Sequence, residues 1–335
     1  MAPHATPQGL GEFDLIRQYF ERPVRRAALG IGDDCALLQP GAGCQLAVSS
    51  DMLVQDRHFF ADADPFQLGH KALAVNLSDL AACGASPLAF TLALALPAAD
   101  AAWLAPFSRG LLALADRHGC ELVGGDTTRG PLNICITVFG EVPAPAGRSQ
   151  ALLRCGARCG DDIYVSGTLG DARLALEAIR GEWTLPAALR KRACTRLHQP
   201  EPRVALGQAL RGLATSAIDI SDGLLGDLGH VLKASGVGAR LDAPCLVDRM
   251  ACHGPALDAV VPAEHQLRCV LAGGDDYELA FTAPADRRDA VAAAAQHSAT
   301  PVSRIGTITA RGGLQVVDAQ GAAITGHWAS FDHFC

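Results

Sequence analysis

Aspartate residues recur along this chain where short apolar segments end in turns, often beside serine or threonine hydroxyls. The segments that share this pattern are Gly30-Ile-Gly-Asp-Asp34, Ser49-Ser-Asp51, Gly124-Gly-Asp-Thr-Thr-Arg-Gly130, Asp219-Ile-Ser-Asp-Gly223 and Gly273-Gly-Asp-Asp-Tyr-Glu-Leu279. Carboxylate and hydroxyl oxygens are hard ligands that suit Mg²⁺ better than zinc. One such turn is ordinary, because Asp after Gly is common turn chemistry. Their recurrence predicts several Mg²⁺ ions that bind phosphates, such as ATP with a phosphomonoester.

Asp79 lies in the segment 71–87, whose apolar residues recur at three- and four-residue steps. That spacing predicts an α-helix with one apolar face, which Gly84 and Pro87 would end. A carboxylate in so apolar a helix needs a charged partner or loses its charge. Two interpretations stay open from these residues alone: a metal ligand, or a single acid on the solvated face.

The segment 121–130 combines an apolar strand with two consecutive glycines, Gly124 and Gly125, and then Asp126. Glycines let the backbone approach a ligand closely. We expect a phosphate or metal loop here, of a type other than the P-loop, or alternatively a turn that Asp126 caps. In residues 216–230, a short strand is expected to carry an acid and a hydroxyl into a helix whose N-terminus favours anions.

Ser49, Ser50 and Asp51 are expected to end a strand over residues 45–51, where they offer oxygen ligands or, alternatively, cap the next segment. His58 follows shortly afterwards and stands directly before two phenylalanines. A histidine in that setting is either packed beside the aromatic rings or binds a ligand.

Composition restricts the class of protein. The 335-residue chain carries a net charge of −7, which argues against nucleic acid as a general partner. Its lysines are only Lys71, Lys191 and Lys233, and none follows the glycine spacing of a P-loop. The longest apolar run, residues 88–99, is too short to span a bilayer. Twelve scattered cysteines without a secretory signal favour reduced thiols and a cytoplasmic location.

The chain is long enough for two domains. Residues 143–149 are rich in proline and glycine and predict a linker between domains 1–142 and 150–335. Alternating strand and helix patterns in both halves indicate an α/β or α+β class. Helices are expected over 12–20, 71–83, 100–118, 169–180, 186–197, 203–210 and 286–296, and strands over 88–96, 132–142, 160–167, 302–308 and 314–317.

These motifs, in this order, together with the segment from Lys71 to Ala82, closely resemble the thiamine-monophosphate kinase family, from about Gly11 to Phe334. The resemblance implies the two-domain aminoimidazole-ribonucleotide-synthetase-like fold, with the N-terminal sheets of two subunits forming a barrel across a homodimer. It also implies ATP-dependent phosphorylation of thiamine phosphate to thiamine diphosphate with several Mg²⁺ ions. No membrane or nucleic acid partner is expected.

The family pattern also assigns residues. Mg²⁺ would be held by Asp34, Ser49, Ser50, Asp51, Asp79, Asp126, Asp219 and Asp222. The nucleotide would contact Gly125, Asp126, Arg154 and Ser221, and thiamine phosphate would face His58, Asp275 and Phe331. Three positions depart from the commoner pattern: Ser50 replaces Thr, Asp275 replaces Glu, and Phe331 replaces Tyr or Trp.

No catalytic side-chain base is assigned, because the nucleophile would be a phosphate oxygen that is already ionised at pH 7. Two alternatives stay open. The first is another ATP-using member of the same fold, such as aminoimidazole-ribonucleotide synthetase. The second is a non-enzymatic protein with structural divalent-metal sites.

Overall fold

The computed structural model describes residues 11–324, 326 and 328. Contacts divide the chain into two compact units. Unit 1 contains the described residues up to 42 together with 48–76 and 87–141, and unit 2 contains 43–47, 77–86 and the chain from 142 onward. The predicted linker, residues 143–149, begins one residue after the longest segment of unit 2 begins. A single boundary at the linker would place residues 43–47 and 77–86 in the N-terminal domain, whereas they belong to unit 2. The predicted domain bounds therefore stay a proposal.

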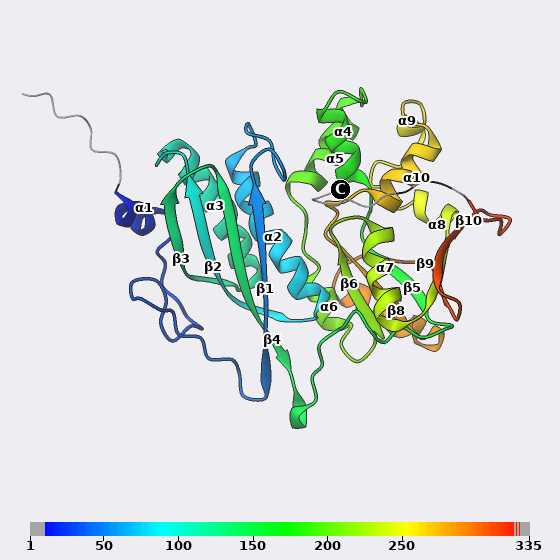
Figure 1. The fold of residues 1–335 in the computed structure, drawn as a ribbon, viewed down its shortest axis with the longest axis horizontal. Coiled ribbons are helices and arrows are strands. Elements are labelled where there is room, and N and C mark those ends of the chain that lie inside the picture. Colours follow the sequence, from blue (N-terminus) through cyan, green and yellow to red (C-terminus); the bar gives the residue numbers. More distant parts are fainter. Residues whose placement is uncertain (1–10, 325, 327, 329–335) are drawn as a thin grey trace, which may run out of the picture. The chain divides into compact units, whose positions relative to one another are not determined.

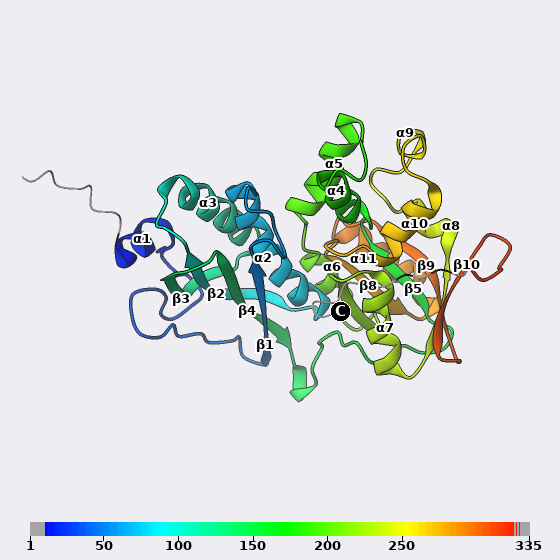
Figure 2. The same ribbon diagram turned by 45° about the horizontal axis from the view of Figure 1, so that its top comes forward.

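A four-stranded sheet in the order β1-β4-β2-β3 forms the first of two sheets. Its strands are β1 (Cys44–Val54), β2 (Ser86–Leu96), β3 (Glu121–Arg129) and β4 (Asn133–Pro143). Two helices, α2 (Pro65–Ala82) and α3 (Ala101–His118), lie on the same side of this sheet (Figure 1, Figure 2). A short helix, α1 (Glu12–Tyr19), precedes them.

Two glycines let α2 and α3 approach closely within unit 1. A Cβ atom on Gly69 would lie 2.1 Å from the carbonyl oxygen of Phe107, and one on Gly110 would lie 1.9 Å from that of Phe66. Each helix therefore presents a glycine to the backbone of the other. Their contact is possible only because both positions lack a side chain.

The second sheet has six strands in the order β10-β7-β9-β5-β8-β6. All its pairings are antiparallel except that of β10 with β7. The strands are β5 (Asp162–Ser166), β6 (Ser216–Ile220), β7 (Gly238–Asp242), β8 (Glu278–Ala283), β9 (Val302–Thr309) and β10 (Gly313–Val317). The helices are α4 (Asp171–Ile179), α5 (Ala187–His198), α6 (Val204–Ala209), α7 (Leu224–Ser235), α8 (Ala243–Val247), α9 (Pro255–Asp258), α10 (Ala263–Ala272) and α11 (Arg288–His297). Short 3₁₀ turns are η1 (Pro145–Gly147) and η2 (Ala285–Arg287).

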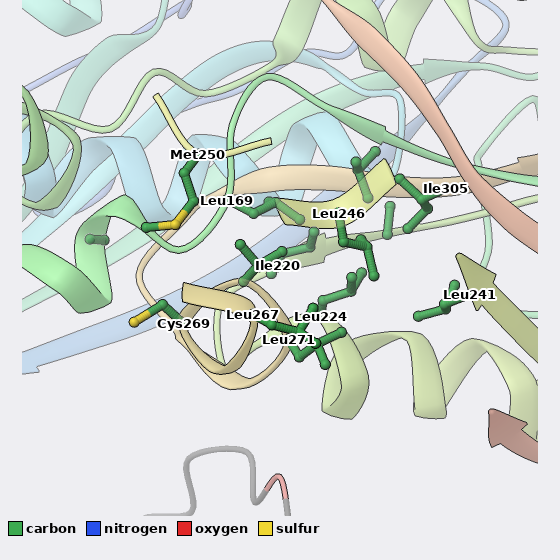
Figure 3. Close-up of a cluster of buried hydrophobic side chains, with 14 of the residues drawn as sticks. Leu169, Ile220, Leu224, Leu241, Leu246, Met250, Leu267, Cys269, Leu271 and Ile305 are labelled. Atoms are coloured by element: carbon green, nitrogen blue, oxygen red, sulfur yellow. The ribbon is translucent and has the colours of Figure 1, made fainter. Parts of the chain in front are cut away.

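Unit 2 is held by one large cluster of buried apolar side chains. Figure 3 shows Leu224 of α7 beside Leu267 and Leu271 of α10, with Ile220 of β6 close by. Each buried leucine contributes about 2 kcal/mol relative to an exposed one. The edge of the second sheet that includes β6 is therefore fixed to α7 and α10 by packing.

The mixed α and β class is confirmed, as are most predicted helices and strands. The predicted helix over 71–83 is α2, which begins earlier, at Pro65. In the part of the chain that the structure describes, no helix is long and apolar enough to cross a membrane. The strand β7 and the helix α10 had no counterpart among the predictions.

Candidate active site

The predicted donors Ser49, Ser50 and Asp51 lie within β1, which continues to Val54 and does not end at Asp51 as predicted. Side chains of successive strand residues point to opposite faces, so Ser49 and Asp51 share one face and Ser50 the other. The Ser50 hydroxyl lies 2.9 Å from Thr137 Oγ1 and donates to the Ile136 carbonyl oxygen at 3.1 Å. The three side chains therefore do not form one cluster.

Asn76 was not among the predicted site residues, yet it fixes Asp51. Its Oδ1 accepts the Asp51 backbone N–H at 3.1 Å, and its Nδ2 donates to the Ala72 carbonyl oxygen at 3.0 Å. Asn76 is 1% exposed, and its bond to Ala72 is buried. An amide side chain inside an apolar helix was the sequence signal for this role, because buried polar groups must be hydrogen-bonded.

The predicted loop at Gly124–Gly130 is wrong, since β3 runs through it to Arg129. A shift in the pairing of β2 with β3 leaves one extra residue on β3, just before Gly124. Gly125 then has φ +146°, and a Cβ there would lie 1.9 Å from the Leu92 carbonyl oxygen. The glycine is therefore required by contact between strands, and Asp126 follows it with an exposed side chain.

His58 is half-buried in the turn that follows β1. Its Nδ1 accepts the backbone N–H of Val54 at 3.0 Å. A neutral imidazole with an accepting Nδ1 carries its proton on Nε2. The ring thus holds the turn with one nitrogen and has the other as a hydrogen-bond donor.

Asp34 lies in the irregular segment before β1 and is exposed. Its backbone N–H donates to Asp33 Oδ1 at 2.8 Å. The Gly30–Asp34 motif is therefore a turn in which one acid shapes the backbone and the next carries an exposed carboxylate.

Within unit 2, Asp219 of β6 is buried, and its Oδ2 accepts a hydrogen bond from the Ser78 hydroxyl at 2.8 Å. Asp79, the next residue on α2, is half-buried. Ser78 was not among the predicted site residues, and its contact with a residue 141 positions away had no sequence signal. The end of α2 thus connects directly to one of the predicted acids.

Asp222 and Ser221 lie in the turn between β6 and α7. The buried Asp227, inside α7, accepts hydrogen bonds from three successive backbone N–H groups there: Ser221 at 3.0 Å, Asp222 at 3.1 Å and Gly223 at 3.1 Å. Burial and then the charge of Asp222 raise the pKa of Asp227 to about 6, although these N–H groups lower it. A protein carboxylate therefore accepts the amides of the turn that precedes α7, and the expected anion preference of the helix N-terminus itself stays a prediction.

Asp275 has a left-handed backbone, with φ +66°, as does Tyr277, with φ +50°. The Asp275 N–H donates to the Ser221 carbonyl oxygen at 2.8 Å, and the Tyr277 hydroxyl donates to Asp275 Oδ1 at 3.1 Å. The backbone of a residue predicted to face thiamine phosphate is therefore bonded to the backbone of one predicted to face the nucleotide.

The alternate residues of this segment, Asp276 and Glu278, are buried anchors. Asp276 accepts the Gly170 N–H at 3.0 Å, and burial raises its pKa well above the usual value. Glu278 accepts from the Ser166 hydroxyl at 2.5 Å and from Arg196 and Arg203 at 2.6 Å. Anchors on both sides of Tyr277 explain how the strained backbone is maintained.

Arg154 and Phe331 are the last two predicted site residues. Arg154 is exposed, and its carbonyl oxygen accepts from the Ser235 hydroxyl at 3.4 Å. Phe331 lies outside the described residues.

Among the described residues, Glu177, His265 and Cys269 are the only three acidic, histidine or cysteine side chains close enough to share a cation. None was predicted. Glu177 already accepts from Arg173 at 2.7 Å and Trp183 at 3.2 Å, and it lies 2.6 Å from His265 Nε2. Burial, and then the Glu177 charge, raise the pKa of the Cys269 thiol. This group is therefore a satisfied hydrogen-bond network rather than a metal centre.

The predicted metal ligands form no such trio among the described residues. Within unit 1 they lie on strands and in a turn. Within unit 2 they are Asp219 on β6, Asp222 in the turn after it, and Asp79 on α2, next to the Ser78 that donates to Asp219. Their donor atoms are carboxylate and hydroxyl oxygens, as Mg²⁺ requires.

Comparisons with known proteins identify the family. Residues 32–142 match the model of the AIR synthase related protein N-terminal domain, and residues 158–319 match that of its C-terminal domain. Thiamine-monophosphate kinase of Escherichia coli K12 is 47% identical over 97% of this chain and 98% of the relative. The chain belongs to the thiamine-monophosphate kinase family.

Solved structures agree with this family assignment. The crystal structure of thiamine-monophosphate kinase from Stenotrophomonas maltophilia is 47% identical, with a TM-score of 0.80 over 89% of this chain and 92% of that one. A structure described as AaThiL complexed with AMPPCP and TMP is 26% identical, with a TM-score of 0.74 over 88% and 89%. The E. coli hydrogenase maturation protein HypE is only 21% identical, with a TM-score of 0.75, and shares the fold alone.

Proposed function

We propose that this member of the thiamine-monophosphate kinase family transfers the γ-phosphoryl group of ATP to thiamine phosphate and forms thiamine diphosphate. The observation that carries this proposal is 47% identity to the E. coli kinase across nearly the full length of both chains. The structure described with AMPPCP and TMP supports the same pair of substrates, an ATP analogue and thiamine phosphate.

Mg²⁺ is the proposed cofactor, with Asp34, Ser49, Ser50, Asp51, Asp79, Asp126, Asp219 and Asp222 as its ligands. Bound Mg²⁺ would neutralise the charge of the phosphates during transfer. Because the Ser50 hydroxyl is directed to β4, we propose that Ser50 contributes its carbonyl oxygen. The exposed carboxylates of Asp34, Asp126 and Asp222 fit this role, because a bound cation links carboxylates to phosphates that they would otherwise repel.

The nucleotide is assigned to Gly125, Asp126, Arg154 and Ser221, and thiamine phosphate to His58, Asp275 and Phe331. The guanidinium of Arg154 would bind phosphate oxygens through paired N–H donors. His58 would donate from Nε2 to the substrate phosphate, since its Nδ1 already accepts from Val54.

The reaction needs no side chain that removes a proton. The attacking atom is an oxygen of thiamine phosphate, which is largely ionised at neutral pH. The protein then contributes alignment of this oxygen with the γ-phosphorus and neutralisation of charge. This is consistent with proposed Mg²⁺ ligands that are all aspartates and serines.

The test is acceptor specificity. ADP release and thiamine diphosphate formation are measured with thiamine phosphate, with unphosphorylated thiamine, and with the ribonucleotide acceptor of aminoimidazole-ribonucleotide synthetase. The proposal predicts equal amounts of ADP and thiamine diphosphate with the first acceptor only. ADP release with the ribonucleotide acceptor would favour the other fold member, and failure to bind Mg²⁺-AMPPCP in calorimetry would favour a non-enzymatic metal protein.

A homodimer formed through the four-stranded sheet is also proposed. β1 is an edge strand of this sheet, and Leu46, Val48 and Met52 expose 43%, 57% and 51% of their surface on one face of it. An exposed apolar edge strand invites pairing with another chain. The cytoplasmic location stays a prediction from the cysteine content.

A further inference from the structure

The turn Ser221–Gly223 is held by hydrogen bonds from two directions within unit 2. On one side, a single oxygen of Asp227, Oδ2, accepts all three of its backbone N–H groups at 3.0 to 3.1 Å. On the other side, the Ser221 carbonyl oxygen accepts the Asp275 N–H at 2.8 Å. The preceding carbonyl, that of Ile220, accepts the Tyr277 N–H at 2.8 Å.

These hydrogen bonds determine which groups of the turn can contact a ligand. Its three amides are directed at Asp227, so the groups that it offers to a ligand are the side chains of Ser221 and Asp222. Asp222 is exposed, whereas Asp227 is 4% exposed. Asp227 therefore holds the backbone of the turn, and the exposed side chain of Asp222 extends from it.

We infer that Asp227 is a positioning residue, whose carboxylate fixes this turn so that Ser221 and Asp222 are aligned for Mg²⁺ and nucleotide. The inference rests on the proposed function, which assigns those two side chains to the site. Three charge-assisted hydrogen bonds to one oxygen are a strong restraint on three successive residues. A turn without them would sample other backbone conformations and hold its ligand less tightly.

The fold of α7 does not depend on Asp227 alone. Leu224, Leu228 and Val231 are buried in the large apolar cluster of unit 2 and fix the helix by packing. Loss of the carboxylate should therefore loosen the turn while the helix keeps its place.

Asp171 provides a matched control in the same unit. It is fully buried at the start of α4, and its carboxylate accepts two backbone N–H groups, Ala251 at 2.7 Å and Cys252 at 2.9 Å. It holds a segment that carries none of the proposed site residues. Asp171→Asn and Asp227→Asn thus remove the same kind of carboxylate from two different backbone segments.

The first experiment is amide hydrogen exchange on the nucleotide-free chain, which does not depend on catalysis. The wild-type amides of residues 221–223 should be protected, and Asp227→Asn should raise their exchange rate by at least about tenfold. Asp171→Asn should leave them unchanged. Wild-type amides that exchange as fast as an exposed loop would overturn the inference.

The second experiment is steady-state kinetics at fixed free Mg²⁺. Asp227→Asn should raise the KM for ATP about tenfold and the KM for thiamine phosphate less than about twofold, whereas Asp171→Asn should change neither. An equal rise in both constants, or an ATP effect no larger than that of Asp171→Asn, would show a merely structural role. So would an Asp227→Asn chain that fails to fold while Asp171→Asn folds. A wild-type chain without kinase activity would refute the proposed function and leave the exchange result intact.

Discussion

His58 accepts the Val54 backbone N–H through Nδ1 at 3.0 Å and so has a structural contact beside its proposed substrate contact. The two can be separated, because an Asn oxygen can accept the same N–H but cannot replace the Nε2 donor. We expect His58→Asn to keep the melting temperature within about 2 °C and to raise the KM for thiamine phosphate about tenfold.

His58→Ala removes both contacts and should lower the melting temperature as well. The KM for ATP serves as the internal control and should stay constant in both variants. If His58→Asn binds thiamine phosphate as well as the wild type does, His58 is only a turn residue.

Asp162 shows how a single buried acid makes stability depend on pH. Hydrogen bonds from Arg288, at 2.6 Å, and Arg304, at 3.2 Å, lower its pKa, although burial opposes them. A folded-state pKa below the unfolded value of about 4 stabilises the protein above that pH, and the stabilisation is lost as the pH falls through the folded value.

Asp162→Asn should therefore lower the melting temperature by at least about 3 °C at pH 7, and by less at pH 3. Melting curves of both chains between these pH values check this. The same difference at every pH would show that the charge of Asp162 does not contribute.

At the scale of elements, α6 is fixed against the end of α2 by a glycine. A Cβ atom on Gly207 would lie 2.0 Å from the Ala81 carbonyl oxygen, and both residues belong to unit 2. Gly207→Ala should destabilise the protein by about 2 kcal/mol, because overpacking forces the backbone to shift. Gly229, in α7, is the control, since a Cβ there meets nothing within 4 Å.

Gly229→Ala should stabilise by about 0.5 to 1 kcal/mol, as expected for alanine in a helix interior. Thermal unfolding of the two variants should thus shift in opposite directions. Two shifts of the same sign would contradict the contact between α6 and α2.

The sequence was sufficient to predict α2, because its apolar residues repeat with helical spacing. It was also sufficient to predict β2, because that strand is one apolar run. It was misleading for β3, where two glycines suggested a loop although they serve close contact with β2. It also suggested that Ser49, Ser50 and Asp51 act together, whereas strand alternation separates Ser50. The helix α10 was not predicted, although Leu267, Val270 and Leu271 repeat with helical spacing.

Among the proposed site residues, the acids could be predicted because carboxylates recur in one chain. The residues that hydrogen-bond to them could not be predicted, since Asn76, Ser78 and Asp227 act through contacts that local sequence does not reveal. An acid early in a helix resembles ordinary favourable helix charge, so Asp227 had no distinguishing signal.

At the scale of the whole molecule, the exposed apolar face of β1 predicts a dimer. Sedimentation should give twice the mass of one chain, and Val48→Glu should give monomers at micromolar concentration, because it places a charge in an apolar contact. Phe13→Glu is the control, since Phe13 of α1 is 76% exposed and α1 contacts β3, at the opposite edge of the sheet from β1. A wild-type chain that sediments as a monomer would refute the dimer.

The central claim is that the acids of this chain act on phosphates through Mg²⁺. Its most direct test is an Mg²⁺ titration of the initial rate for wild type, Asp126→Asn and Arg154→Ala. Loss of a metal ligand should shift the Asp126→Asn curve to higher Mg²⁺ by about tenfold, with part of the activity restored by mass action. The Arg154→Ala defect should persist at high Mg²⁺, because the ion cannot replace a guanidinium. An Asp126→Asn curve with the wild-type midpoint would contradict the account.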